Sequence, residues 1–293
     1  MLNPVKNMTA LQPAFVDRAP RDLEGWVALF SFADLPVLPE TAAAIEDWRA
    51  LEDHVDAHQI AESIGGDPLM TLKLLAHVAS LQRPGITDDR RGEIETVTEA
   101  LVLLGIGPFF RAFGPQATIE QALADHAEAL QGLQSVLRRS RRAANFALGF
   151  AAHRMDHDAA VIYEATLLHG FAELLLWLRA PTLALEICRR QQEDPTLRSA
   201  LVQREVLGVE LGTLQQALMK AWRLPTLLAR VTDDRLADDS QMRNVHLAVR
   251  LARHTARSWE DAAVPDDLLE IGQLLQLGEV PTRRLLLDID QEL

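Results

Sequence analysis

Signals that begin and end α-helices recur along this chain, and they restrict its fold more than any other feature. Asp56 is followed three residues later by Gln59, a capping-box pattern, and the segment stops at the glycine pair 65–66. Thr96 and Glu99 repeat the same pattern at the start of another apolar segment. These signals predict a series of short, clearly bounded helices.

The composition also favours an all-α protein. Ala, Leu, Arg, Glu and Gln are abundant, and these residues form helices well, whereas only 5% of residues are aromatic. No segment alternates apolar and polar residues for long enough to indicate a strand. The 293 residues are 48% hydrophobic, enough for a large core in one domain or two.

Charge and cysteine content restrict the partners and the compartment. The formal charge of −13 would repel a phosphate backbone, so general nucleic-acid binding is not expected. Cys188 is the single cysteine and the N-terminus lacks a signal-peptide core, which favours a reducing cytoplasm. The best membrane candidate, residues 171–181, contains Glu173 and Arg179 and is shorter than the ~20 apolar residues of a bilayer span. No membrane association is therefore expected.

The organisation predicted along the chain is a lead segment followed by many helices. Three prolines and no sustained period mark residues 1–24 as the lead segment, and residues 233–240 are an acidic break. Helices are expected at about 40–51, 56–64, 67–80, 96–104, 118–137, 139–154, 158–179, 182–192, 198–221, 226–232, 240–259, 266–277 and 281–292.

His169 is the strongest candidate for chemistry, because it lies in an apolar stretch directly before Gly170. A histidine followed by an aspartate at such a place would supply half of a metal-dependent phosphohydrolase site, whereas glycine has no side chain to give. The favoured interpretation is a buried structural histidine that bonds a neighbouring carbonyl or carboxylate.

Two other histidine pairs have helical i, i+4 spacing but no identifiable third ligand. His153 and His157 flank Arg154 in a polar tract typical of a solvated helix end, and His54 and His58 are also surrounded by polar residues. We therefore predict no metal site and no cofactor.

One dense basic cluster remains, made of Arg138, Arg139, Arg141 and Arg142. A charged helix face is the favoured interpretation. The alternative is a contact site for an anion or an acidic partner, because guanidinium groups bind phosphate and carboxylate in a bidentate way. The sequence contains no Walker loop, G-x-G-x-x-G, G-x-S-x-G or C-x-x-C motif, and Cys188 is interpreted as a small core residue.

From about residue 28 to 232 the chain resembles the HDOD family, a degenerate branch of the HD metal-dependent phosphohydrolase superfamily found in bacterial signalling proteins. The resemblance rests on segments that occur in the family's order: "LPVLPE", "IAESIGGDPLMTLKLLAHVAS", "ETVTEALVLLGIGPF", "SRRAANFALGFAA", "EATLLHGFAELLLW" and "EVLGVELGTLQQALMKAWRLPTLL". It implies an HDOD domain at 25–232, divided into an N-terminal helical part (25–115) and an HD-like bundle (116–232). Residues 233–293 resemble the C-terminal helical extension of some proteobacterial stand-alone members.

The resemblance also implies that the metal site of this superfamily is vestigial here. In catalytic relatives an aspartate would stand at Gly170, beside His169, and an earlier helix would bring a histidine where this chain has Arg139. A further histidine would be expected at Leu211, and a late histidine pair is replaced by the "TDD" region at 232–234. Losing most of the ligands leaves no way to generate a metal hydroxide.

Arg139 could take over the place of the cation in this vestigial site. If it lies over His169, its fixed charge would fill that space, with Glu164 or Glu173 as the carboxylate partner.

Six further positions match the family pattern and are interpreted as architectural. Asp67 is expected to cap a helix whose first residue is Pro68, and Trp222 is expected to fill a gap in the packing just before Pro225. They are Asp67, Pro68, Gly105, Gly208, Trp222 and Pro225.

The function implied is a non-catalytic signal-transduction or regulatory module in a bacterial cytoplasm. It would act through another signalling protein, and a small anionic ligand in the vestigial pocket could modulate it. The alternatives are a weak metal-dependent phosphohydrolase or cyclic-dinucleotide phosphodiesterase, and a protein that binds a nucleotide second messenger without cleaving it.

Overall fold

The regular structure of this chain is helical. The computed structural model describes residues 15–81, 94–194, 196–231 and 240–291. No strand occurs within these ranges, where the only approach to one is an isolated parallel bridge between Val37 and Thr118. The all-α class is confirmed. The "TDD" region and residues 1–14 of the lead segment lie outside the described residues.

Four N-terminal helices begin and end close to the predicted limits, whereas the helices at Leu23–Leu29 and Ile106–Ala112 were not predicted. Capping boxes form at Asp56 with Gln59 and at Thr96 with Glu99, and Gly65 follows the end of its helix. The helices are α1 (Leu23–Leu29), α2 (Pro39–Arg49), α3 (Ala57–Ile64), α4 (Pro68–Leu81), α5 (Val97–Leu104), α6 (Ile106–Ala112) and α7 (Ile119–Ala122).

Polar side chains of the α4 region hold the extended segment 35–38. Lys73 Nζ donates to the Leu35 carbonyl (2.8 Å), and Asp67 Oδ2 accepts a bond from the Leu38 N–H (2.8 Å). The prolines around this segment keep it out of helical geometry, so its backbone groups need partners from elsewhere. These bonds fix where α2 begins relative to α4.

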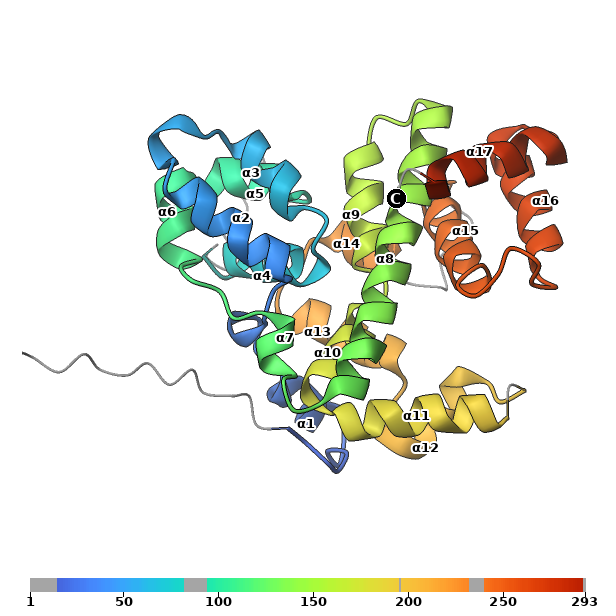
Figure 1. Cartoon of the computed structure of the whole chain (residues 1–293), viewed down its shortest axis with the longest axis horizontal. Helices are drawn as coiled ribbons and strands as arrows, with labels where there is room; N and C mark the ends of the chain where they lie inside the picture. The colour runs from blue at the N-terminus through green and yellow to red at the C-terminus, as the bar shows by residue number, and fades with distance from the viewer. Residues whose placement is uncertain (1–14, 82–93, 195, 232–239, 292–293) are drawn as a thin grey trace, which may run out of the picture.

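The central helix α8 (Ala127–Arg154) runs without interruption for 28 residues. The predicted break near residue 138 is wrong, because the arginines there are good helix formers and no glycine or proline ends the helix. Figure 1 shows α8 between the N-terminal helices α2–α6 on one side and the C-terminal helices α15–α17 on the other.

Three predicted helices are each divided in the structure. The first of them, 118–137, breaks at residues 123–126 between α7 and α8. The segment 158–179 breaks at residues 168–170 into α9 (Ala159–Leu167) and α10 (Phe171–Arg179). The segment 198–221 breaks after Gly208, whose φ of +73° suits glycine, into α12 (Ser199–Leu207) and α13 (Leu211–Ala221). Between α10 and α12 lies α11 (Pro181–Glu193).

The apolar stretch Ala159–Arg179 belongs to the core of this fold. By length and composition it could cross a membrane, but 61% of its most apolar window is buried inside the protein. It is also divided between α9 and α10, which pack against α8. Both observations are consistent with a soluble protein.

The last four helices are packed on the bundle. They are α14 (Thr226–Val231), α15 (Ser240–His254), α16 (Val264–Leu275) and α17 (Glu279–Gln291). Helices α15, α16 and α17 contact α8, and α14 contacts α9 and α15. Asn244 on α15 donates to the Ala147 carbonyl of α8 (3.2 Å), and Asp290 on α17 accepts two bonds from Arg142 (2.7 and 2.8 Å). Trp259 donates to the same carboxylate (3.0 Å). The extension is therefore bonded to the bundle.

Candidate functional site

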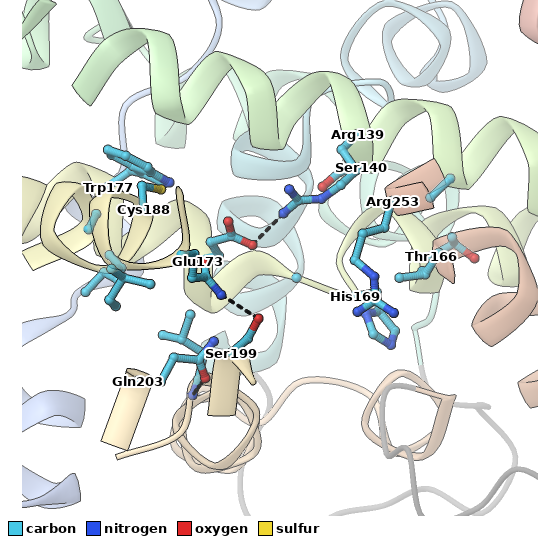
Figure 2. A pocket seen from close by; sticks show the side chains of 18 residues that line it. Arg139, Ser140, Thr166, His169, Glu173, Trp177, Cys188, Ser199, Gln203 and Arg253 are labelled. Atoms are coloured by element: carbon cyan, nitrogen blue, oxygen red, sulfur yellow. Dashed lines mark hydrogen bonds and ion pairs between the residues drawn. The ribbon is translucent and has the colours of Figure 1, made fainter. Parts of the chain in front are cut away.

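A cavity of about 350 Å³ lies where α8 faces the break between α9 and α10 (Figure 2). Arg139 from α8, His169 and Gly170 from the break, and Leu211 at the start of α13 all line it. The fold thus brings together the four residues that the resemblance assigns to the vestigial site. Cys188 of α11 also lines the cavity, half-buried, and burial raises the pKa of its thiol.

His169 occupies the break between the two helices. Its N–H donates to the Thr166 carbonyl (3.1 Å), and its own carbonyl accepts a bond from Gln215 Nε2 of α13 (2.6 Å). Its ring meets that of His246 nearly edge to face, with centroids 6.1 Å apart. Gln215 also accepts a bond from the Ala172 N–H (3.4 Å), so it holds both sides of the break. Sequence reasoning missed Gln215, whose signal is an amide on an otherwise apolar helix face.

The residues at this cavity do not fit the metal that the HD superfamily implies. Gly170 offers no ligand although a Cβ there would meet open space, Leu211 is apolar, and Arg139 is cationic. Within the described ranges, no three His, Cys, Asp or Glu side chains are grouped so that they could hold a metal ion. A hydrolytic metal needs several such ligands and an activated water.

Arg139 forms an ion pair with Glu173 of α10, at 2.5 Å between Nη2 and Oε2. Of the two partners considered from the sequence, Glu173 is therefore the one it contacts. Figure 2 shows the guanidinium directed toward Glu173 and not stacked over His169. Both side chains are about one-third exposed, so the pair contributes modestly to stability but places a fixed positive charge in the cavity.

Glu164, the other carboxylate considered, serves a different purpose. It is buried on α9, and both of its oxygens accept the Val97 N–H at the start of α5 (2.8 and 3.0 Å). Burial raises the pKa of the Glu164 carboxyl to about 8, and the charge of Glu99 acts in the same direction against the opposing hydrogen bond. Glu164 therefore joins the N-terminal helices to the bundle.

We expect Glu164→Gln to flatten the pH dependence of stability. Because the folded-state pKa is raised from 4.5 to about 8, the contribution of the protonated carboxyl is fully present below pH 4.5 and is lost as pH rises through 8. Between pH 4.5 and 8, the free energy of unfolding of wild type should therefore fall by up to ~1.4 kcal/mol per pH unit relative to that of the variant. Urea unfolding of wild type and Glu164→Gln at several pH values measures this difference, and Glu128→Gln, at an exposed position, is the control. Parallel curves of unfolding free energy against pH for wild type and Glu164→Gln would contradict the expectation.

The arginine cluster does not form one surface. Successive residues of a helix point in directions about 100° apart, so the four guanidinium groups separate. Arg138 is exposed, Arg139 enters the cavity, Arg141 reaches the N-terminal helices and Arg142 reaches α17. Their partners are Ser135 for Arg138, Glu173 for Arg139, Glu40 and the Gly66 carbonyl for Arg141, and Asp290 and Thr255 for Arg142. The cluster is therefore neither a shared anion site nor a purely solvated helix face, and both interpretations from the sequence are incomplete.

The remaining histidine pairs lie at the surface. His153 and His157 are exposed where α8 ends at Arg154, as expected for a solvated helix end. His54 is exposed, and His58 lies 3.3 Å from Glu62.

A second cavity of about 440 Å³ adjoins the first and shares His169, Val249 and Arg253 with it. Sequence reasoning missed this site, because it predicts residues 240–259 only as a helix and assigns no role to its side chains. The available signal was the helical spacing of its basic residues, which recur on one face. They are Arg243, His246, Arg250 and Arg253.

The six family-signature positions have architectural surroundings. Asp67 caps α4 by accepting the N–H groups of Leu69 and Met70 (2.9 and 3.2 Å), as predicted. The two glycines have positive φ and follow helix ends, Pro68 begins α4, Pro225 precedes α14, and Trp222 is 8% exposed against aromatic rings. None of them lines either cavity; they are Asp67, Pro68, Gly105, Gly208, Trp222 and Pro225.

Comparison with known proteins agrees with this fold. The MmoQ response regulator from Methylococcus capsulatus str. Bath has 21% sequence identity and a TM-score of 0.65, over 86% of this chain and 98% of its own. A virulence factor (cj0248) from Campylobacter jejuni subsp. jejuni has 18% identity and a TM-score of 0.63, over 92% and 99%. No curated protein matches the chain. The family model for the HDOD domain matches residues 35–235, more than half of the chain, and the protein therefore belongs to the HDOD domain family.

Proposed function

We propose that this protein is a non-catalytic regulatory module of bacterial signal transduction, which works in the cytoplasm by binding another protein. The observation that carries the proposal is the Arg139–Glu173 ion pair at the vestigial site. A cation in a hydrolytic site must be held by neutral imidazoles and carboxylates, and a guanidinium within the cavity opposes its binding. The carboxylate that could have served as a ligand is already bound to that guanidinium.

The comparisons support the signalling part of this proposal. The chain belongs to the HDOD family, and one structural relative carries the description of response regulator. That likeness concerns the fold, so the regulatory role here rests on the site and the family together.

Metal content tests the non-catalytic part. The wild-type chain, purified without chelator and dialysed in turn against Mn, Fe, Mg and Zn, is expected to retain far less than one metal ion per molecule by inductively coupled plasma mass spectrometry. Near-stoichiometric metal, together with phosphodiesterase activity, would contradict the proposal.

The double variant Arg139→His, Gly170→Asp sharpens this test. An aspartate at position 170 has room for its Cβ, so the variant restores two potential ligands without crowding the cavity. We still expect no tight metal binding, because two restored side chains and His169 do not rebuild the second shell that orients such ligands. A gain of stoichiometric metal would show that the site is only two substitutions from a metal centre.

The interaction part needs a reconstituted complex. Crosslinking of the tagged full-length chain in its host, followed by mass spectrometry, identifies candidates, and each candidate is then purified and mixed with the chain. We expect one of them to bind in the micromolar range or tighter, as regulatory contacts do. If no candidate binds after purification, the proposed interaction role is wrong.

A further inference from the structure

Arg253 differs from the other arginines at the two cavities. It projects from α15 toward His169 (Figure 2), and it lines both cavities. Arg139 and Arg250 are held by carboxylates, whereas the Arg253 guanidinium makes no ion pair or hydrogen bond to any residue of the described ranges. A guanidinium offers five N–H donors in a planar fork, and here they remain available to a ligand.

The two cavities share lining residues and are together called the joined cavities, and their walls are positive in a strongly acidic protein. They carry an excess of two positive charges, or one when Asp267, which lies behind Arg250, is included. The chain as a whole carries −13. A phosphate monoester has a charge of roughly −1.5 to −2 at pH 7, which matches this local excess. The charged wall residues are Arg139, Arg243, Arg250, Arg253, Glu173 and Glu270.

The part of the first cavity away from Arg253 suits an organic group. Apolar side chains of α10 and α11 form one wall, and amide and hydroxyl side chains stand beside them. The two cavities, of about 350 and 440 Å³, have the size of small-molecule sites in proteins. The wall residues that matter here are Leu176, Trp177, Ile187, Gln191, Ser199 and Gln203.

We infer that the joined cavities bind a small organic phosphate monoester, with its phosphate on Arg253 and its organic part toward Trp177. This ligand would link α15 of the C-terminal extension to α8 and α10 of the bundle, so its binding would regulate the contact between them. The inference deepens the proposed function, on which it rests, by naming the class of ligand that a non-catalytic module would sense. It also places the phosphate contact on the extension, with Arg139 as the one member of the Arg138–Arg142 cluster that lines the cavity.

Calorimetric titration of the full-length chain with phenyl phosphate tests this inference. Wild type is expected to bind, and Arg253→Gln to bind at least about tenfold more weakly, because a charge-assisted bidentate contact is lost. Arg253→Lys keeps the charge without the fork and should fall between the two. Since Arg253 holds no other described residue, these variants should unfold at the wild-type temperature.

Arg138→Gln is the matched control. It removes the same charge from an exposed position on α8 that lines neither cavity. Its affinity for phenyl phosphate should stay within about twofold of wild type, because an exposed charge outside the cavities is screened by salt and does not contact the ligand. Equal losses in Arg138→Gln and Arg253→Gln would overturn the inference, since net charge alone would then explain the binding.

Two other ligands define the chemistry. Inorganic phosphate and benzoate should each bind more weakly than phenyl phosphate, because one lacks the organic part and the other the second charge. Tighter binding of benzoate, or no binding of phenyl phosphate at millimolar concentration, would overturn the inference and leave the metal-content result unaffected. Release of inorganic phosphate from bound phenyl phosphate would instead contradict the proposed non-catalytic function while supporting the binding site.

Discussion

Replacing Asp67 with alanine is expected to lower the free energy of unfolding by about 2–5 kcal/mol, one of the two largest effects predicted for a single substitution in this protein. The carboxyl is 1% exposed and accepts the N–H groups of Leu38, Leu69 and Met70. Burial raises its pKa although these donors oppose the shift. Alanine would remove the cap of α4 and leave a buried N–H of the extended segment without a partner.

Asp67→Asn separates these two contributions. The amide oxygen can still cap α4, but its NH₂ group would face the Leu38 N–H, which is also a donor. We expect a loss of roughly half that of the alanine variant. Chemical denaturation with circular dichroism measures both variants, and the expectation is wrong if alanine costs no more than asparagine.

Trp222→Ala is expected to cost about 3–5 kcal/mol, because a large buried side chain would be replaced by a cavity. The centroids of the indole and the Phe171 ring are 6.0 Å apart, and the two rings are stacked with 26° between their planes. The Phe32 ring centroid is also 6.0 Å away, with 76° between the planes. Phe171 begins α10 directly after Gly170, so Trp222 supports the break between α9 and α10 through its contact with Phe171. The loss should therefore appear in thermal unfolding and in weaker binding of phenyl phosphate.

Trp222→Phe is the control for ring packing. It keeps an aromatic face for Phe171 and should cost clearly less than alanine, in line with the smaller volume removed. A melting temperature for Trp222→Ala equal to that of wild type would show that this side chain does not fill the core as its burial implies.

Helix starts and stops could be predicted from the sequence because they depend on neighbours within one turn. The Asp56 and Thr96 capping boxes and the Asp67 N-cap are all present, since a side chain three residues away can bond the free N–H groups of a helix start wherever the helix lies. The division of the segment 158–179 could not be predicted this way. It depends on Gln215, a residue of another helix, which bonds the backbone on both sides of the break.

The candidate site shows the same difference between what local sequence predicts and what contacts between distant residues decide. The sequence by itself determined that Gly170 can supply no ligand and that an arginine stands at position 139, because the chemistry of a side chain does not depend on the fold. Only the tertiary structure decided that Arg139 binds Glu173, that Glu164 joins α9 to α5, and that Arg253 enters the cavity from the C-terminal extension. Each of these facts depends on which helix faces meet, and that is decided by packing between residues far apart in the chain, for which no local pattern exists.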